Sequence, residues 1–225
     1  MSSITIWGAG TPRSFRPIWV AEELRLEFEH RAIGPRTGET QTPEYQRLNR
    51  KQKIPFLQDG EIKISESVAI CRYLRKKYSN GSIYQPDSAI ALAKEDEWCC
   101  YIYGELDETS LYVMRRHGDL GAIYGDCPEA VASSRGYAEK HFGVIAELLA
   151  TREYLMADHF SVPDILLMSC LDWAVAYEVA LPQGLLDYHA RLSQRPAYLS
   201  AMQINYPDLF GGYPWADLKG SKYST

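Results

Sequence analysis

The chain has no long apolar run and no run of basic residues. Its longest apolar stretches, such as residues 165–171, are far shorter than the roughly 20 residues that a membrane-spanning helix requires. The formal net charge of the 225 residues is -5 and the pI is about 5.6, so no basic surface is expected for a phosphate backbone or an anionic membrane. We therefore expect neither nucleic acid nor a membrane as a partner.

Targeting and metal-binding signals are also missing. The apolar residues 4–7 have no basic flank, no long apolar segment and no small-residue cleavage site, so no signal peptide is expected. The five cysteines are an odd number, and they form no C-x-x-C pair and no cluster with histidine at metal-ligand spacing. These absences predict a cytoplasmic protein with reduced thiols and no metal site.

The first 80 residues alternate between strand patterns and helix patterns. Short apolar runs predict strands at residues 4–7, 28–33, 56–58 and 62–64. Helical spacing predicts helices at residues 14–24 and 44–48, and a third that opens at residues 65–67. Pro17 is expected in the first turn of its helix, where there is no intrahelical bond to lose. The predicted order is β-α-β-α-β-β-α.

The second part of the chain has no convincing strand. After a break at residues 79–82, apolar residues recur at helical spacing up to residue 112 and again over residues 135–149 and 165–179. An apolar content of 46% suffices for a real core in each part. We expect a first domain at residues 1–80, a linker at 81–88 and an all-helical domain at 89–225, ending in an irregular tail from residue 206.

Ser161 and Asp164 form the strongest helix-start signal of this second part. Ser161 can cap the helix while Asp164 reaches back to it as in a capping box, and Phe160 with Ile165 can form a hydrophobic staple. We therefore expect Asp164 to be a buried acid at the start of this helix.

Residues 53–78 carry the most specific pattern. Asp59-Gly60 between two apolar runs predicts a tight hairpin, because Gly accepts the positive φ that a two-residue turn requires. Before it, Pro55 lacks an N–H and biases Ile54 towards an extended conformation, which leaves the polar backbone groups of Ile54 free to pair with an extended peptide. A cis Ile54-Pro55 bond would point those groups outward, and the sequence leaves its geometry open.

Ser65, Glu66 and Ser67 lie where the next helix begins. The first N–H groups of a helix have no intrahelical partner and its dipole is positive there, so a ligand carboxylate is favoured at this position. The alternative is structural: Ser65 caps the helix and Glu66 complements the dipole. Together with the extended segment at Ile54, the pattern favours a receptor for a short peptide with a free carboxylate.

These residues resemble those of the cytosolic glutathione transferases. That family has an N-P-x-G-K-V-P-x-L-x-D-G segment followed by E-S-x-A-I-x-x-Y-L, and this chain has corresponding residues at 49–60 and 66–74. Two positions depart from the pattern, since Arg50 replaces the usual Pro and Gln52 the usual Gly. The resemblance implies an α/β thioredoxin-like N-terminal domain followed by an all-α domain.

The resemblance also implies glutathione as the co-substrate and assigns residues to it. Ile54, which precedes Pro55, would pair with the cysteinyl backbone of glutathione. Glu66 and Ser67 would hold its γ-glutamyl end, and Lys53 would lie near its glycyl end. By the same analogy the protein is a homodimer in which the first domain of one subunit lies against the helical domain of the other.

The chemistry of the family depends on ionising the glutathione thiol. A free thiol has a pKa of about 8.5, and the thiolate is the nucleophile. A hydroxyl or N–H donor next to the sulfur, at the positive end of a helix, favours the charged form. The turn between the first strand and first helix can supply this donor, and its candidates are Thr11, Arg13 and Ser14.

Two alignments of this turn remain open. Thr11 falls where theta-like and zeta-like members of the family carry the catalytic Ser, and Thr11-Pro12 resembles the Thr-Pro-Asn of the nu class, with Arg13 replacing the Asn. Alternatively, Ser14 to Pro17 resembles the motif of β-etherase-like members, which makes Ser14 the donor. The structural alternatives are that Thr11 is an ordinary turn residue and Ser14 a helix cap. No Tyr occurs in this turn, which disfavours the tyrosine-dependent classes.

The helical domain must offer an apolar wall for the second substrate. Our candidates share an apolar or aromatic side chain at helical spacing; they are Tyr101, Tyr103, Met114 and Trp173. The predicted reaction is attack of the thiolate on a small hydrophobic electrophile, as in detoxification. Alternatives are a glutathione-dependent disulfide reductase, isomerase or β-etherase-type lyase, and a protein that keeps the fold as a non-catalytic binding protein.

Overall fold

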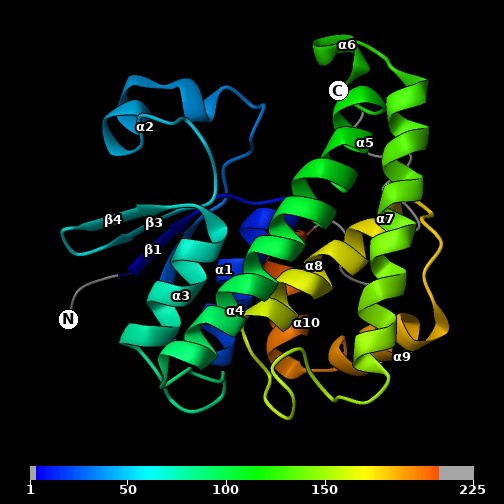
Figure 1. Cartoon of the computed structure of the whole chain (residues 1–225). Helices are drawn as coiled ribbons and strands as arrows, with labels where there is room; N and C mark the ends of the chain where they lie inside the picture. Colours follow the sequence, from blue (N-terminus) through cyan, green and yellow to red (C-terminus); the bar gives the residue numbers. More distant parts are fainter. Residues whose placement is uncertain (1–3, 208–225) are drawn as a thin grey trace. The chain divides into compact units, whose positions relative to one another are not determined.

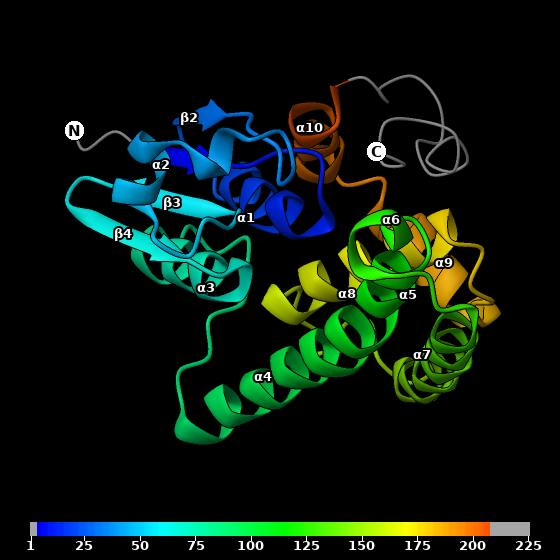
Figure 2. The same ribbon diagram turned by 90° about the horizontal axis from the view of Figure 1, so that it is seen from above.

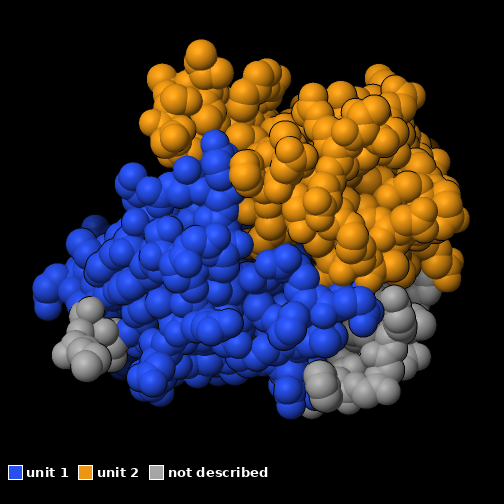
Figure 3. All heavy atoms as spheres, turned by 90° about the horizontal axis from the view of Figure 1, so that it is seen from below, with its two compact units in different colours: residues 1–85, 193–210 blue, residues 86–192, 211–225 orange. Residues whose placement is uncertain are grey.

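The computed structural model of the chain describes residues 4–207 (Figure 1). They form two compact units, which Figure 3 draws in different colours. The first unit comprises residues 4–85 and 193–207, and the second comprises residues 86–192. The chain therefore leaves the first unit once and returns to it for its last described helix.

A four-stranded sheet is the centre of the first unit. Its strands are β1 (Ile4–Trp7), β2 (Phe28–Arg31), β3 (Phe56–Asp59) and β4 (Ile62–Ser65), in the order β2-β1-β3-β4. β1 runs parallel to β2 and antiparallel to β3, and β3 and β4 form an antiparallel hairpin. The four predicted strands and the thioredoxin-like fold are confirmed, although β2 ends two residues before the predicted end at residue 33.

The described residues of the first unit contain four α-helices. They are α1 (Pro12–Glu23), α2 (Pro43–Leu48), α3 (Ser67–Lys77) and α10 (Pro196–Asn205), with a 3-10 turn η1 (Glu39–Gln41) before α2. α1 contacts both α3 and α10, as Figure 2 also shows. It begins two residues before the predicted start at Ser14 because Thr11 caps it. Pro17 therefore lies in the second turn of α1 and not in the first, which corrects the prediction.

The hairpin turn lies one residue later than predicted. Asp59 pairs with Ile62, so the two-residue loop is Gly60-Glu61, and Gly60 alone of this pair has the left-handed φ of 59°. Asp59 is buried, and one oxygen of its carboxylate accepts hydrogen bonds from three groups at the end of α3: the hydroxyls of Tyr73 and Tyr78 and the ammonium of Lys77. Asp59 thus belongs to β3 and connects it to α3.

The second unit is helical. It contains α4 (Ala89–Tyr101), the π-helical segment η2 (Ile102–Leu111), α5 (Tyr112–His117), α6 (Gly121–Tyr124), α7 (Pro128–Leu149), α8 (Val162–Ala176) and α9 (Gln183–Leu192). The ribbon runs without interruption from α4 to α5 (Figure 1). Almost every side chain of α8 is buried, which makes α8 the centre of this unit. The predicted all-helical character is confirmed.

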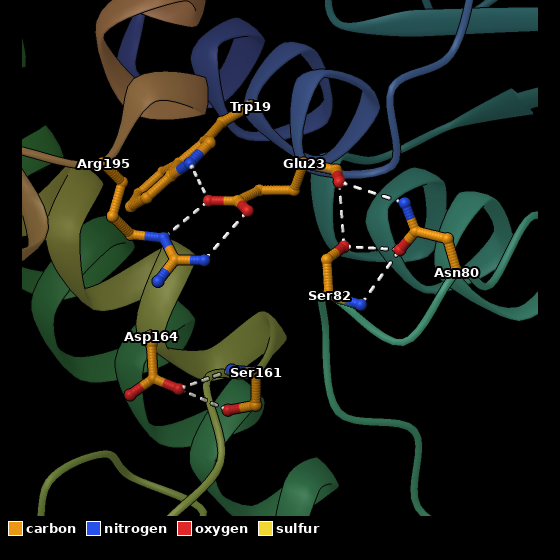
Figure 4. A network of polar contacts seen from close by, with 7 residues as sticks. All are labelled: Trp19, Glu23, Asn80, Ser82, Ser161, Asp164 and Arg195. Carbon is orange, nitrogen blue, oxygen red and sulfur yellow. Dashed lines mark hydrogen bonds and ion pairs between the residues drawn. The ribbon is translucent and has the colours of Figure 1, made fainter.

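The capping box at the start of α8 is present as predicted. Asp164 Oδ2 accepts hydrogen bonds from the backbone N–H of Ser161 at 2.8 Å and from its hydroxyl at 2.5 Å (Figure 4). Asp164 Oδ1 accepts from the N–H of Leu155 at 2.8 Å and from the hydroxyl of Tyr188 at 2.6 Å. The fully buried Asp164 therefore connects the start of α8 to the preceding loop and to α9.

The last described helix belongs to the first unit and packs against α1. Tyr198 of α10 makes edge-to-face contacts with Phe15 and Trp19 of α1, at ring-centroid distances of 5.3 and 5.0 Å. The predicted helical domain, residues 89–225, had included α10. Of the predicted tail, the structure describes residues 206 and 207, and the remainder lies outside the described residues. Nowhere in residues 4–207 is a helix both long and apolar enough to cross a membrane.

Candidate functional site

Ile54 is held in the position that the sequence predicts for peptide pairing. The Ile54-Pro55 bond is cis, which decides the question that the sequence left open. In the described part of the chain, neither the N–H nor the C=O of Ile54 has a hydrogen-bond partner. The side chain of Ile54 packs on Gly8, where an added Cβ would lie 2.7 Å from Ile54 Cβ, and Gly8 has a φ of +115°. Gly8 is therefore a positioning residue that the sequence showed only as part of a turn.

Two side chains fix the peptide group just before Ile54. The hydroxyl of Tyr45 and the side-chain amide of Asn49 both donate to the carbonyl of Lys53, at 2.7 and 2.9 Å. Both are buried, and burial raises the pKa of Tyr45 to about 12. Asn49 belongs to the family pattern, but nothing in the sequence separates Tyr45 from an ordinary core residue of its helix.

The loop between α2 and β3 keeps its turn despite the two departures from the family pattern. Gln52, which replaces the usual Gly, has a φ of 55°. This is the left-handed region, in which Gly has no steric penalty and other residues do. The backbone therefore adopts here the conformation that a glycine favours, although the residue at this position is Gln52.

Glu66, and not Ser65, is the N-cap of α3. Its backbone has a φ of 77° and a ψ of 119°, and its side chain makes no capping hydrogen bond. The exposed carboxylate of Glu66 pairs with the ammonium of Lys51 at 2.9 Å. The alternative in which Ser65 caps the helix is therefore wrong, because Ser65 is the last residue of β4.

Ser67 is the first residue of α3 and is buried. Its hydroxyl oxygen accepts a hydrogen bond from Nη1 of Arg16 at 3.2 Å. Arg16 is fully buried in α1 and connects this helix to the start of α3. The hydroxyl oxygen of Ser67 accepts from Arg16, so the hydroxyl proton of Ser67 points elsewhere. This proton can be donated to a carboxylate.

Thr11 and Ser14 form a reciprocal cap at the start of α1. The N–H of Ser14 donates to Thr11 Oγ1 at 3.0 Å and the N–H of Thr11 donates to Ser14 Oγ at 3.2 Å, while the two hydroxyl oxygens lie 2.8 Å apart. Ser14 is fully buried and Thr11 is partly exposed. The two candidates that the sequence could not separate are therefore in contact, and Thr11 is the one with exposed surface.

Arg13 lies between them in the first turn of α1 and is also partly exposed. A guanidinium at this position adds positive charge to the end of α1 where the helix dipole is positive. The turn thus combines a hydroxyl, a cation and a helix N-terminus within four residues. Such a set of groups stabilises an anion.

The four candidates for the substrate wall lie on four elements of the second unit, α4, η2, α5 and α8. Tyr101 ends α4 and its hydroxyl lies 2.7 Å from Nδ1 of His141, whereas Tyr103 lies in η2 and donates to Glu108 at 3.1 Å. Met114 and Trp173 are buried, with exposed fractions of 1% and 5%. Tyr101 and Tyr103 are thus the two of the four with exposed surface, and the wall itself stays a prediction.

Comparison with known proteins agrees with this geometry. The family model for the N-terminal domain of glutathione S-transferase matches residues 2–76. Glutathione S-transferase hmp2 of Hypomyces subiculosus is 30% identical over 153 residues, which are 64% of this chain and 69% of that protein. The chain belongs to the glutathione S-transferase family.

Other members of the family are similar to different extents. Glutathione S-transferase theta-1 of Bos taurus is 28% identical over 154 residues, which are 67% of this chain and 64% of the bovine protein, slightly less than two thirds of its length. A solved theta-class glutathione S-transferase from Xanthomonas axonopodis pv. citri, with glutathione bound, has a TM-score of 0.77 and 26% identity and covers 89% of this chain and 97% of its own. The glutathione S-transferase fold thus extends over nearly the whole chain.

Proposed function

We propose that this family member is a glutathione transferase that ionises the glutathione thiol for attack on a small hydrophobic electrophile. The observation that carries the proposal is a shared turn. Residues 8–11 support Ile54 through Gly8 and present Thr11 at the start of α1. Groups for peptide pairing and for thiolate stabilisation are therefore placed by the same short segment.

Glutathione binding in this proposal uses backbone and side-chain groups of the first unit. Ile54, ahead of the cis bond to Pro55, pairs through its N–H and C=O with the cysteinyl backbone, and Lys53 lies near the glycyl carboxylate. Ser67 and the first N–H groups of α3 receive the γ-glutamyl carboxylate, and Glu66 receives its ammonium group. The solved Xanthomonas relative has glutathione bound, which supports glutathione as the ligand in this proposal.

Thr11 is the proposed thiolate donor. It is partly exposed, whereas Ser14 is fully buried and its hydroxyl is engaged within the unit. The dipole of α1 and the charge of Arg13 add to the hydroxyl of Thr11 in favouring the anion. Each unit by which the thiol pKa falls corresponds to roughly 1.4 kcal/mol of preference for the thiolate.

The remaining parts of the proposal rest on the family resemblance. Tyr101, Tyr103, Met114 and Trp173 supply the wall for the electrophile, with the two partly exposed tyrosines as its principal members. The enzyme acts as a cytoplasmic homodimer, uses glutathione as a co-substrate and needs no metal. A role in detoxification follows from attack on hydrophobic electrophiles.

The donor assignment is tested by replacing each hydroxyl separately. We expect Thr11→Val to raise the pKa of the bound glutathione thiol by about 1 to 2 units, and to lower kcat/KM near neutral pH about 10- to 100-fold, because the charged form loses its hydroxyl donor. We expect Ser14→Ala to raise this pKa by less than half as much. The pKa is read from thiolate absorbance against pH, and Ser88→Ala, which removes the capping hydroxyl of α4, is the control.

Binding and turnover are measured before the variants are compared. Calorimetry with millimolar glutathione tests the tripeptide site, and absence of binding heat on folded protein would overturn the proposed function. Turnover is then measured with chlorodinitrobenzene, a hydroxyethyl disulfide and an aryl ether. Reaction with the first supports the transferase, reaction only with the second or third replaces it by the reductase or lyase, and binding without any reaction favours a non-catalytic protein.

A further inference from the structure

Asn205, the last residue of α10, makes three hydrogen bonds to the turn that carries Thr11. Its carbonyl accepts from the N–H of Gly10 at 2.9 Å. Its side-chain Nδ2 donates to the carbonyl of Thr11 at 3.1 Å, and its Oδ1 accepts from the hydroxyl of Ser14 at 2.8 Å. Asn205 is 1% exposed and lies more than 190 residues from this turn in the sequence. The end of α10 therefore holds the start of α1.

These contacts decide which way the hydroxyl protons point. The Nδ2 of Asn205 must face the carbonyl of Thr11, since only the nitrogen can donate to a carbonyl, so Oδ1 faces Ser14. Oδ1 carries no proton, and Ser14 Oγ must therefore donate its single proton to Asn205. In the 2.8 Å contact between the two hydroxyl oxygens, Thr11 is then the donor and Ser14 the acceptor.

We propose that Asn205 is a positioning residue for the thiolate donor. By taking the proton of Ser14 and holding the carbonyl of Thr11, it makes Thr11 the one hydroxyl of this pair whose proton can turn to the glutathione sulfur. A thiolate is a charged acceptor and binds that proton more strongly than the neutral oxygen of Ser14 does. This inference rests on the proposed function, because it concerns the geometry of that same thiolate.

Loss of the Asn205 side chain has a specific consequence. The proton of Ser14 then turns to the carbonyl or the hydroxyl of Thr11, at 3.0 and 2.8 Å, and Thr11 loses the donor that fixes its backbone. The hydrogen bond from Thr11 to the sulfur becomes weaker, so the thiol pKa rises. Glutathione binding changes little, because the contacts of Asn205 are with Gly10, Thr11 and Ser14 and not with the proposed binding residues Ile54, Glu66 and Ser67.

The experiment compares Asn205→Ala, Asn205→Leu and Thr11→Val by thiolate absorbance and by the pH profile of kcat/KM for glutathione. We expect both Asn205 variants to raise the thiol pKa by about one unit and to lower kcat/KM roughly tenfold below that pKa. The glutathione KM should stay within about twofold, and the rate should return to the wild-type level above the new pKa. Asn205→Leu fills the space that Asn205→Ala leaves empty.

A double variant separates positioning from a general structural effect. If Asn205 acts through Thr11, the double variant Asn205→Ala/Thr11→Val should have the same glutathione thiol pKa as Thr11→Val alone. Gln203→Ala, at an exposed position of the same helix, is the control for helix propensity and should leave the pKa unchanged.

Failure of this inference differs from failure of the proposed function. If Thr11→Val raises the thiol pKa and the Asn205 variants leave it unchanged or lower it, Asn205 does not position the donor. A rate that stays low at every pH, or a full additive rise in the double variant, also overturns the inference and indicates a structural role. If Thr11→Val itself has no effect on the pKa, or no glutathione binds, the proposed function fails first.

Discussion

Glu66 begins α3 with a backbone conformation that residues with a side chain rarely adopt. Its φ of 77° carries a cost on the order of 1–3 kcal/mol, which must be offset by the surrounding structure. Strain of this kind concentrates at ligand sites. The carboxylate at this position is exposed and engaged only in an exposed pair with Lys51, so it can exchange that partner for a ligand ammonium.

A substitution at Glu66 tests its place in the glutathione site. We expect Glu66→Ala to raise the glutathione KM at least tenfold, because the γ-glutamyl ammonium loses its anionic partner, while the protein stays folded. Steady-state kinetics and circular dichroism measure the two effects. Glu61→Ala, at an exposed position of the hairpin loop, is the matched control. An unchanged KM for the Glu66 variant would contradict the placement of the γ-glutamyl end.

Gln52 shows that a departure from the family pattern does not by itself predict a different backbone conformation. The sequence marks Gln52 as a departure from the family glycine, which suggests a different loop. The structure gives it a left-handed φ of 55°, so the loop keeps a glycine-like backbone with a residue that fits it less well. Asn49 closes this turn, because its carbonyl accepts from the N–H of Gln52 at 3.0 Å and its side chain donates to the Lys53 carbonyl at 2.9 Å.

At the scale of elements, α2 determines where the peptide-pairing segment lies. The hydroxyl of Tyr45 and the amide of Asn49 hold the Lys53 carbonyl, and the next residue is Ile54. A loop with no regular structure is thereby fixed by a helix of six residues. The proposed pairing with glutathione depends on this fixation, because a mobile Ile54 must be ordered before it can bind.

Tyr45→Phe tests this arrangement. Loss of one hydrogen bond should raise the glutathione KM about fivefold with kcat unchanged, because about 1 kcal/mol of loop stabilisation is lost. Tyr124→Phe, at an exposed tyrosine of the second unit, is the control for KM.

The same variant has a pH-dependent effect on stability. The pKa of Tyr45 is raised from 10.0 to about 12, so between these values the unfolded state loses its proton while the folded state keeps it. The stabilisation from neutral Tyr45 is therefore complete below pH 10 and is lost as the pH rises through about 12. Urea unfolding at several pH values in this window should show a steeper decline for the wild type than for Tyr45→Phe. Equal slopes would contradict the assignment.

Prediction of elements from the sequence failed at their edges. The hairpin was predicted with its turn at Asp59-Gly60, but the strand pairing extends to Asp59 because its carboxylate is held by the hydroxyls and the ammonium at the end of α3. α1 was predicted to begin at Ser14, but Thr11 caps it earlier. In both cases contacts with side chains decided where an element ends, and periodicity carries no information about them.

At the scale of the whole chain, Glu23 at the end of α1 links three segments of the first unit. Its carboxylate accepts from Nε1 of Trp19 at 3.0 Å and from Arg195 through two bonds of 2.6 and 2.9 Å (Figure 4). Its backbone carbonyl accepts from the side chains of Asn80 and Ser82. Three segments therefore meet at Glu23: α1, the segment that leaves the first unit and the segment that returns to it.

Arg195→Met tests the contribution of this link to stability. We expect the free energy of unfolding to fall by about 2–3 kcal/mol, because the nearly buried carboxylate of Glu23 loses its paired cation. Adding Glu23→Gln should recover part of the loss, since the uncompensated charge is removed. Denaturant unfolding measures both variants, and Arg47→Met, in an exposed pair with Glu44, should cost less than about 1 kcal/mol. Equal losses for Arg195→Met and Arg47→Met would contradict this account.

The sequence by itself determined the strand and helix order, the segment at Ile54 proposed for peptide pairing and the helix start at Glu66 and Ser67. These depend on local signals, namely proline and glycine geometry, hydrophobic periodicity and the unpaired N–H groups of a helix start. Only the tertiary structure decided that α10 returns to the first unit, that Asn205 bonds to the turn of Thr11 and that Gly8 lies against Ile54. These contacts join residues that are far apart in the chain, and local sequence patterns carry no information about such pairs.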